Sequence, residues 1–241
     1  MIAKSPSKLL SYRNARKVFL SWYEKSTCPT IEHKVIAAKT IEHVIPQCMY
    51  KQSQPNLSGD MHNFIVYPGK LNSRRSNFRM TDRIPMTSIV NVLNQEGELT
   101  KIKNSKDLRS TCFSYMGNFV PLVKHRGRIA RCVTYFVATY PDFADDVFQK
   151  VIDPSILVMW YHQYPISKWE IKLNAHILHV QGNDNPFVSH PESIHECFNK
   201  YINMDMFKSF DYSKHYTCHN ELHTIKDSVV SYFEQRPIVT S

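Results

Sequence analysis

The stretch Ile41–Arg79, IEHVIPQCMYKQSQPNLSGDMHNFIVYPGKLNSRRSNFR, carries most of the polar patterning of this 241-residue chain. Its three polar segments are Glu42-His43, Asp60-Met61-His62-Asn63 and Asn72-Ser73-Arg74-Arg75. Carboxylate and amide oxygens are hard ligands that suit magnesium. An imidazole can take a proton from water near neutral pH, and arginine can bind phosphate oxygens through two parallel hydrogen bonds. The combination indicates metal-assisted attack of water on a phosphodiester.

Two strands are predicted around these segments, one over residues 35–41 and one over residues 64–67, because both runs are rich in β-branched or aromatic residues. Proline, asparagine, serine and glycine predict a loop between them. Asn72 is expected at or near the start of a helix. Neighbours on a regular strand point to opposite faces, so Glu42 and His43 reach one site only if the strand ends, twists or bulges there. The sequence leaves these three possibilities open.

Three helices are predicted in the second half of the chain. Apolar spacing over residues 128–140 predicts the first, which Pro141 should stop. A second should open with proline in its first turn and run over residues 154–161. A third should begin after Ser167, because Glu170 follows at the spacing of a capping box.

Motifs outside Ile41–Arg79 extend the pattern along the chain. They are residues 12–17 (YRNARK), 119–121 (FVP), 126–131 (RGRIAR) with Tyr135, 160–170 (WYHQYPISKWE), Asn174 and 181–187 (QGNDNPF). In this order, and together with Ile41–Arg79, they resemble the endonuclease I family, secreted and periplasmic bacterial nucleases of the ββα-metal (His-Me finger) class. The resemblance covers residues 12–191.

The resemblance implies an α+β, mostly helical fold with a ββα-metal core and surrounding helices. Residues 1–191 would form one nuclease domain. Residues 192–241 would form a C-terminal extension packed on that domain or appended to it.

The activity implied by the resemblance is metal-dependent hydrolysis of phosphodiester bonds in DNA, and also in RNA, with little sequence specificity and with 5′-phosphate and 3′-hydroxyl products. The cofactor would be Mg²⁺, for which Mn²⁺ can substitute, and the protein is expected to be a monomer. The alternative is a catalytically inactive nucleic-acid-binding or structural protein that retains the fold. The intact Glu42, His43 and Asn72 favour the enzyme.

Residue roles follow from the same resemblance. His43 would be the general base and Arg75 would hold the scissile phosphate as the second catalytic residue. Glu42 and Asn72 would bind the metal, although an isolated Asn72 reads as a helix cap. Residues expected to orient the site, or alternatively only to bond the strand ends, are Asp60, His62 and Asn63. The cations expected to bind nucleic acid are Lys70, Arg74, Arg79, Arg128 and Arg131. The loop over residues 44–59 is short, so an accessory arginine or acidic ligand from it is not assured.

The net charge of +9 is concentrated in residues 1–191, which carry +11, whereas residues 192–241 carry −2. A basic excess raises the local concentration of polyanions and supports sequence-independent phosphate binding. The longest apolar run, Ile156–Tyr161, is too short to span a bilayer, so we expect no membrane partner.

A further helix is expected from residue 12 onward, because Tyr12, Ala15, Val18, Phe19 and Trp22 recur at helical spacing. No apolar secretory segment precedes it, which indicates an intracellular protein, cytoplasmic or nuclear, with export or organelle targeting left open. The six cysteines form no C-x-x-C pair, and their number alone does not establish disulfides. Zinc is an alternative metal, either at Cys197 with Cys218-His219 or at His176 with His179, but neither set gives four ligands at a familiar spacing.

Overall fold

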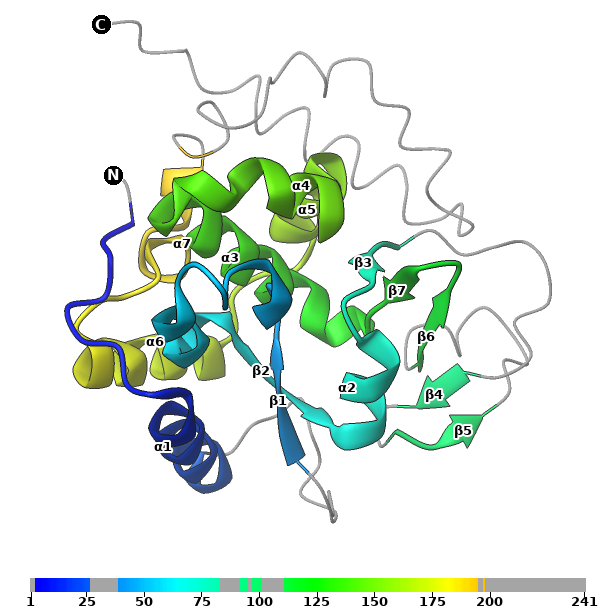
Figure 1. Ribbon diagram of the computed structural model, residues 1–241, viewed down its shortest axis with the longest axis horizontal. Coiled ribbons are helices and arrows are strands. Elements are labelled where there is room, and N and C mark those ends of the chain that lie inside the picture. Colours follow the sequence, from blue (N-terminus) through cyan, green and yellow to red (C-terminus); the bar gives the residue numbers. More distant parts are fainter. Residues whose placement is uncertain are drawn as a thin grey trace, which may run out of the picture.

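A computed structural model describes residues 3–26, 39–82, 92–94, 97–100, 111–194 and 197. In these residues the chain is mixed α/β and mostly helical, with two small sheets, which confirms the predicted α+β class (Figure 1). No helix in these ranges is long and apolar enough to cross a membrane.

The first sheet is a two-stranded antiparallel pair made of β1 (Lys39–His43) and β2 (Phe64–Pro68). Its register places Glu42 opposite Ile65 and His43 opposite Phe64. Three 3₁₀ turns, Gln47–Met49, Pro55–Gly59 and Met61–Asn63, lie in the connection between the strands. Helix α2 (Gly69–Arg75) follows β2 directly, so the chain runs strand, strand, helix through this stretch.

The second sheet has five strands in the order β3-β7-β6-β4-β5. They are β3 (Arg79–Met80), β4 (Val92–Asn94), β5 (Leu99–Thr100), β6 (Thr111–Tyr115) and β7 (Asn118–Val120). The turn between β6 and β7 has positive φ at both Met116 and Gly117, the backbone that suits a tight hairpin. These strands were not predicted, because they are short and lack a clear alternation of apolar and polar residues.

The predicted helices are present, with one boundary shifted. Helix α3 (Val123–Thr139) begins five residues before the predicted Arg128 and ends before Pro141. The remaining helices are α1 (Tyr12–Lys25), α4 (Ala144–Lys150), α5 (Pro154–Gln163), α6 (Lys168–Gln181) and α7 (Pro186–Ser189). The predicted cap of α6 is confirmed, since Ser167 Oγ accepts the Glu170 N–H at 3.1 Å.

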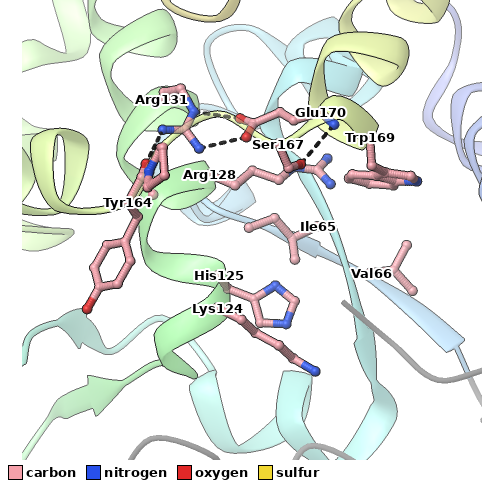
Figure 2. Close-up of a pocket in the computed structure, with 12 residues that line it drawn as sticks. Ile65, Val66, Lys124, His125, Arg128, Arg131, Tyr164, Ser167, Trp169 and Glu170 are labelled. Carbon is pink, nitrogen blue, oxygen red and sulfur yellow. Dashed lines mark hydrogen bonds and ion pairs between the residues drawn. The ribbon is translucent and has the colours of Figure 1, made fainter. Parts of the chain in front are cut away.

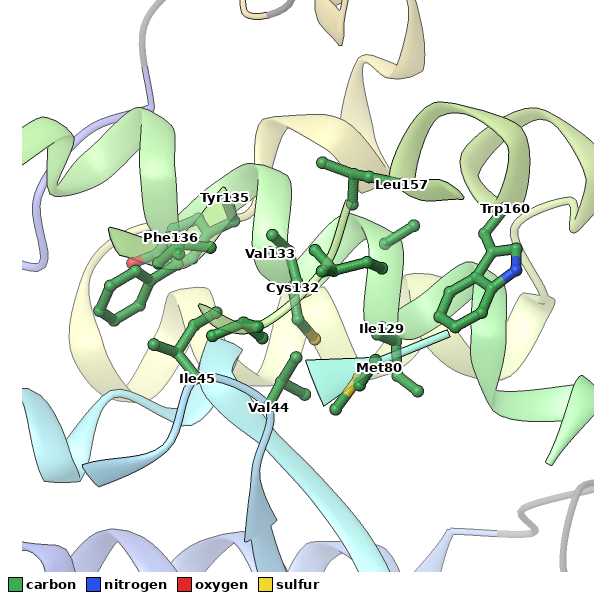
Figure 3. Close-up of a cluster of buried hydrophobic side chains, with 14 of the residues drawn as sticks. Val44, Ile45, Met80, Ile129, Cys132, Val133, Tyr135, Phe136, Leu157 and Trp160 are labelled. Carbon is green, nitrogen blue, oxygen red and sulfur yellow. The ribbon is translucent and has the colours of Figure 1, made fainter. Parts of the chain in front are cut away.

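Two apolar clusters hold the β1–β2 hairpin between helices. The larger one surrounds α3, and it packs Val44 and Ile45, just after β1, with Val133 and Leu157 (Figure 3). The smaller one packs Phe64 and Val66 of β2 against Phe19 of α1 and Trp169 of α6. The hairpin is therefore covered on both faces, which fixes the strand ends where the polar residues lie.

The predicted boundary between residues 191 and 192 does not mark the end of the core. Ile194 and Cys197 are both buried in the larger cluster. The rest of the predicted extension, residues 198–241, lies outside the described residues, as does the start of the first predicted strand, residues 35–38.

Candidate active site

Glu42 and His43 diverge at the end of β1, which resolves the question that the sequence left open. The His43 ring packs against Phe64 and against Tyr12 of α1, with ring centroids 5.0 Å and 5.1 Å apart respectively. Glu42 instead pairs with Arg75 of α2. The two residues therefore keep the alternation of a regular strand, and any shared site must lie beyond the strand end.

His43 is held by a backbone carbonyl in the loop between the strands. Its Nε2 lies 3.0 Å from Ser58 O. A carbonyl can only accept, so Nε2 carries the proton and Nδ1 keeps its lone pair. Burial lowers the His43 pKa to about 4, against the opposing hydrogen bond to Ser58. The ring is therefore neutral near pH 7, with one nitrogen able to accept a proton.

Glu42 is a buried carboxylate whose loss of hydration is only partly offset by its contacts. Its Oε1 lies 3.0 Å from Arg75 Nε, and the two side chains are only 4% and 1% exposed. These two atoms are close but not aligned as a hydrogen bond, and neither has a hydrogen-bond partner among the described residues. Burial raises the Glu42 pKa to about 7, and the positive charge of Arg75 opposes that shift.

Asn72 attaches α2 to β1 beside Glu42. Its Nδ2 donates to Ile41 O at 3.0 Å and to Thr40 Oγ1 at 3.1 Å. Both interactions use the amide nitrogen. The side-chain oxygen is therefore directed away from them, and no hydrogen bond from the described residues reaches it. The simple cap role is excluded, because α2 begins three residues earlier at Gly69.

The donor set at this end of β1 fits a hard divalent cation. The Glu42 carboxylate has an oxygen without a hydrogen-bond donor, and the Asn72 amide oxygen is uncommitted. Magnesium accepts a small number of protein oxygens and keeps several waters. Within the described ranges no group of three or more His, Cys, Asp and Glu side chains could hold a metal ion. By the chemistry of their oxygens, Glu42 and Asn72 are the residues suited to such a cation.

Arg75 occupies a different place from the one predicted for it. Its side chain is 1% exposed. Besides facing Glu42, it donates to Val44 O at 2.7 Å and to Ser76 O at 2.9 Å. A guanidinium that binds a phosphate must reach the surface. In this structure Arg75 neutralises Glu42 and ties α2 to the chain after β1.

Asp60, His62 and Asn63 make two different kinds of contact. Asn63 holds the backbone after His43 in place. Its Oδ1 accepts the Ile45 N–H at 2.7 Å, and its Nδ2 donates to Ile45 O at 3.0 Å. Asp60 accepts hydrogen bonds from the side chains of Tyr135, Tyr140 and Gln181. His62 contacts Asn183 O at 3.1 Å. Asp60 and His62 thus join the hairpin to α3 and to the end of α6.

The predicted nucleic-acid-binding cations divide by exposure. Lys70 and Arg74 are exposed on α2. Arg79 is partly exposed and lies 3.6 Å from Asp153. Arg128 donates to Phe64 O at 2.5 Å and covers the Trp169 ring.

Arg131 lines one pocket together with Arg128, but its guanidinium is bonded internally (Figure 2). It is 3% exposed and is bonded to both carboxylate oxygens of Glu170, at 2.7 Å and 2.6 Å, and to Tyr164 O at 2.9 Å. The expected contact of Arg131 with nucleic acid stays a prediction.

Sequence reasoning missed three residues that surround His43. Ser58 contributes its backbone carbonyl, and Gln47 places its Nε2 at 3.1 Å from His43 Nε2 and 3.4 Å from Nδ1. Tyr12 contributes its ring. A backbone acceptor leaves no trace in a sequence, and Tyr12 lies 31 positions from His43 on a helix whose apolar spacing accounts for it.

Comparison with known proteins decides the family. The family described as Endonuclease I matches residues 4–192. The chain belongs to the endonuclease I family. This membership confirms the predicted enzyme class, hydrolytic nucleases.

Individual relatives agree with that assignment. A periplasmic deoxyribonuclease of Aeromonas hydrophila is 26% identical over 192 residues, which cover 73% of each chain. An extracellular deoxyribonuclease of the same organism is 28% identical over 164 residues, 61% of this chain and 63% of that protein. Endonuclease-1 of Buchnera aphidicola subsp. Baizongia pistaciae is 23% identical over 141 residues, 58% of this chain and half (50%) of that protein.

The expectation of an intracellular protein is wrong. Relatives named periplasmic and extracellular deoxyribonucleases point to secretion instead. The expectation rested on the lack of an apolar segment ahead of helix α1 (Tyr12–Lys25), and that lack does not decide the compartment.

Proposed function

We propose that this endonuclease I family member is a metal-dependent endonuclease with a ββα-metal (His-Me finger) core formed by β1, β2 and α2. The observation that carries the proposal is the environment of His43. The neutral ring is fixed by Ser58 O so that Nδ1 keeps a lone pair that can accept a proton. Glu42, its neighbour on β1, and Asn72 of α2 carry oxygens that suit a hard cation.

The protein residues account for the proton in hydrolysis. His43 Nδ1 takes a proton from water as the water oxygen forms a bond to phosphorus. The bond between phosphorus and the 3′ oxygen then breaks, and its electron pair leaves with that oxygen, which takes up a proton from solvent. The products are a 5′-phosphate and a 3′-hydroxyl end. The proton on His43 returns to solvent readily, because burial disfavours the charged ring.

Glu42 and Asn72 would hold Mg²⁺, or Mn²⁺ in its place. When bound, the cation supplies positive charge that stabilises the developing charge on the phosphate and on the departing oxygen. Arg75 keeps a second positive charge beside Glu42, which favours the ionised carboxylate that a metal requires.

The substrate that we propose is DNA, with RNA as a second substrate, cleaved with little sequence preference. Support for DNA comes from the relatives, which are named deoxyribonucleases. Support for low specificity comes from Lys70 and Arg74, which are exposed on the helix that carries Asn72. Contacts to phosphate position a protein on DNA but carry no direct sequence information.

Plasmid nicking with and without a chelator tests the proposal. Wild-type protein should nick plasmid in Mg²⁺ and stop in excess chelator. His43→Ala should lower the rate by about 10²–10⁴, the usual contribution of a general base. The matched control is His179→Ala, which removes an exposed imidazole from α6 and should leave the rate unchanged.

DNA binding of His43→Ala separates the enzyme from a binding protein. Affinity should stay close to wild type, because it depends on phosphate contacts that the variant keeps. Cleavage that persists in chelator contradicts the metal assignment. Binding without cleavage by the wild-type protein in Mg²⁺ would establish the alternative, a binding protein that has kept the fold.

A further inference from the structure

We propose that helix α1 forms one wall of the nucleic-acid site, with Arg16 binding a phosphate next to the scissile one. This inference rests on the proposed function and adds a substrate-binding residue to it.

Tyr12, the first residue of α1, is the part of the helix that reaches the general base. Its ring centroid lies 5.1 Å from that of His43, at an interplanar angle of 51°. It also lies edge-on to Phe64, at 6.1 Å and 87°. Tyr12 remains partly exposed, whereas His43 is buried. A substrate that approaches His43 from solvent therefore passes the side of α1 that begins at Tyr12.

The position of α1 is fixed by packing. Ala15, Phe19 and Tyr23 bury one side of the helix, and Phe19 meets Phe64 edge-on at 5.4 Å. The segment before the helix is just as tightly placed, because a Cβ added at Gly59 would lie 1.9 Å from Leu10 O. Gly59 follows Ser58, whose carbonyl holds His43. The helix and the imidazole are thus attached to the same short loop.

Arg16 lies one helical turn after Tyr12, on the same side of α1. It is exposed, and none of the described residues forms an ion pair with it. Its charge and that of Glu42 both act on the Tyr12 phenol, in opposite directions on its pKa, which places Arg16 within electrostatic reach of the site. A phosphate bound between Tyr12 and Arg16 could accept hydrogen bonds from the Arg16 guanidinium.

The need for such a residue comes from the rest of the site. Arg75 and Arg131 are 1% and 3% exposed, and both are bonded internally. Lys70 and Arg74 supply exposed charge on the α2 side of the hairpin. Arg16 supplies it on the α1 side, so a nucleic-acid strand that crosses His43 would be held from both directions.

Paired charge removals on α1 test this inference. Arg16→Gln removes the proposed contact. Lys17→Gln removes the same charge one residue later, about 100° around the helix and also exposed. Affinity for a fluorescent DNA duplex should be measured in chelator, where no cleavage occurs, over a range of salt concentrations.

The expected result is a several-fold loss of affinity for Arg16→Gln and a loss of about one unit from the salt slope, as for one phosphate contact. Lys17→Gln should change the slope by less, and Arg16→Lys should restore part of it. In cleavage assays Arg16→Gln should raise KM more than it lowers kcat. The inference is overturned if Arg16→Gln and Lys17→Gln behave alike. That outcome differs from failure of the proposed function, in which the wild-type protein would not cleave DNA at all.

Discussion

Two buried pairs of glutamate and arginine join distant parts of this protein, and they are built differently. Arg131 and Glu170 make two aligned contacts, at 2.7 Å and 2.6 Å, and Arg131 also binds Tyr164 O. Glu42 and Arg75 make one contact, at 3.0 Å, without hydrogen-bond alignment. Both pairs are almost fully shielded from solvent.

This difference distinguishes a purely structural ion pair, Arg131 with Glu170, from an ion pair that belongs to a candidate binding site, Glu42 with Arg75. Burial of charge is costly unless the hydrogen-bonding capacity of both groups is satisfied. The pair between α3 and α6 comes close to that condition, because both carboxylate oxygens accept an aligned hydrogen bond and three guanidinium N–H groups are bonded. The pair between β1 and α2 does not meet it, and burial raises the pKa of Glu42 to about 7. A carboxylate left in that state is suited to a ligand that completes its coordination.

Matched substitutions should produce the largest effects. Glu170→Gln leaves Arg131 buried without a counter-charge and should lower the free energy of unfolding by about 3–5 kcal/mol. Glu42→Gln should cost less, because Arg75 keeps its bonds to Val44 O and Ser76 O. Urea unfolding followed by tryptophan fluorescence measures both.

Metal binding by the same variants should show the opposite order. Glu42→Gln should weaken Mn²⁺ binding measured by calorimetry on the folded protein, and Glu170→Gln should not. Equal stability losses with unchanged Mn²⁺ affinity in both variants would mean that the two pairs serve the same structural purpose.

The pH dependence of cleavage should follow Glu42 rather than His43. The Glu42 pKa is raised to about 7, so its carboxyl is protonated below that pH and loses metal affinity by about tenfold per pH unit. The His43 pKa is lowered to about 4, so this ring stays neutral throughout. At low Mg²⁺ the rate should rise up to pH 7 and then level off.

Added magnesium distinguishes the two groups. More Mg²⁺ competes with the proton on Glu42 and should move the midpoint of the profile to lower pH. If the midpoint of the pH profile does not change with the Mg²⁺ concentration, the titrating group is not a metal ligand.

The smallest effect concerns two neighbouring arginines. Arg74→Gln removes an exposed charge and should reduce the salt slope of DNA binding by about one unit if the side chain contacts a phosphate. Arg75→Gln should leave the slope unchanged and lower the stability instead. Anisotropy titrations at several salt concentrations compare the two variants. A flatter slope for Arg75→Gln would support the predicted contact between Arg75 and the scissile phosphate.

The sequence predicted much of the local structure around the site because short-range rules govern it. The capping box at Ser167 and the proline at the start of α5 are read directly from neighbouring residues. The five-stranded sheet was not predicted, because strands of two to five residues depend on partners far along the chain. The burial of Arg75 and Arg131 was not predictable either, because charged side chains are usually exposed and the internal partners of these two lie on other elements.

The sequence by itself determined the family, the α+β class and the candidate residues Glu42, His43 and Asn72, because these depend on residue type and order. Only the tertiary structure decided which partner each residue meets. It directed Glu42 toward Arg75 and His43 toward Ser58 O, and it buried Arg131 against Glu170. The physical reason is that hydrogen bonding and desolvation depend on what surrounds a side chain. Those surroundings come from segments such as α1, α3 and α6, which a local sequence pattern cannot place.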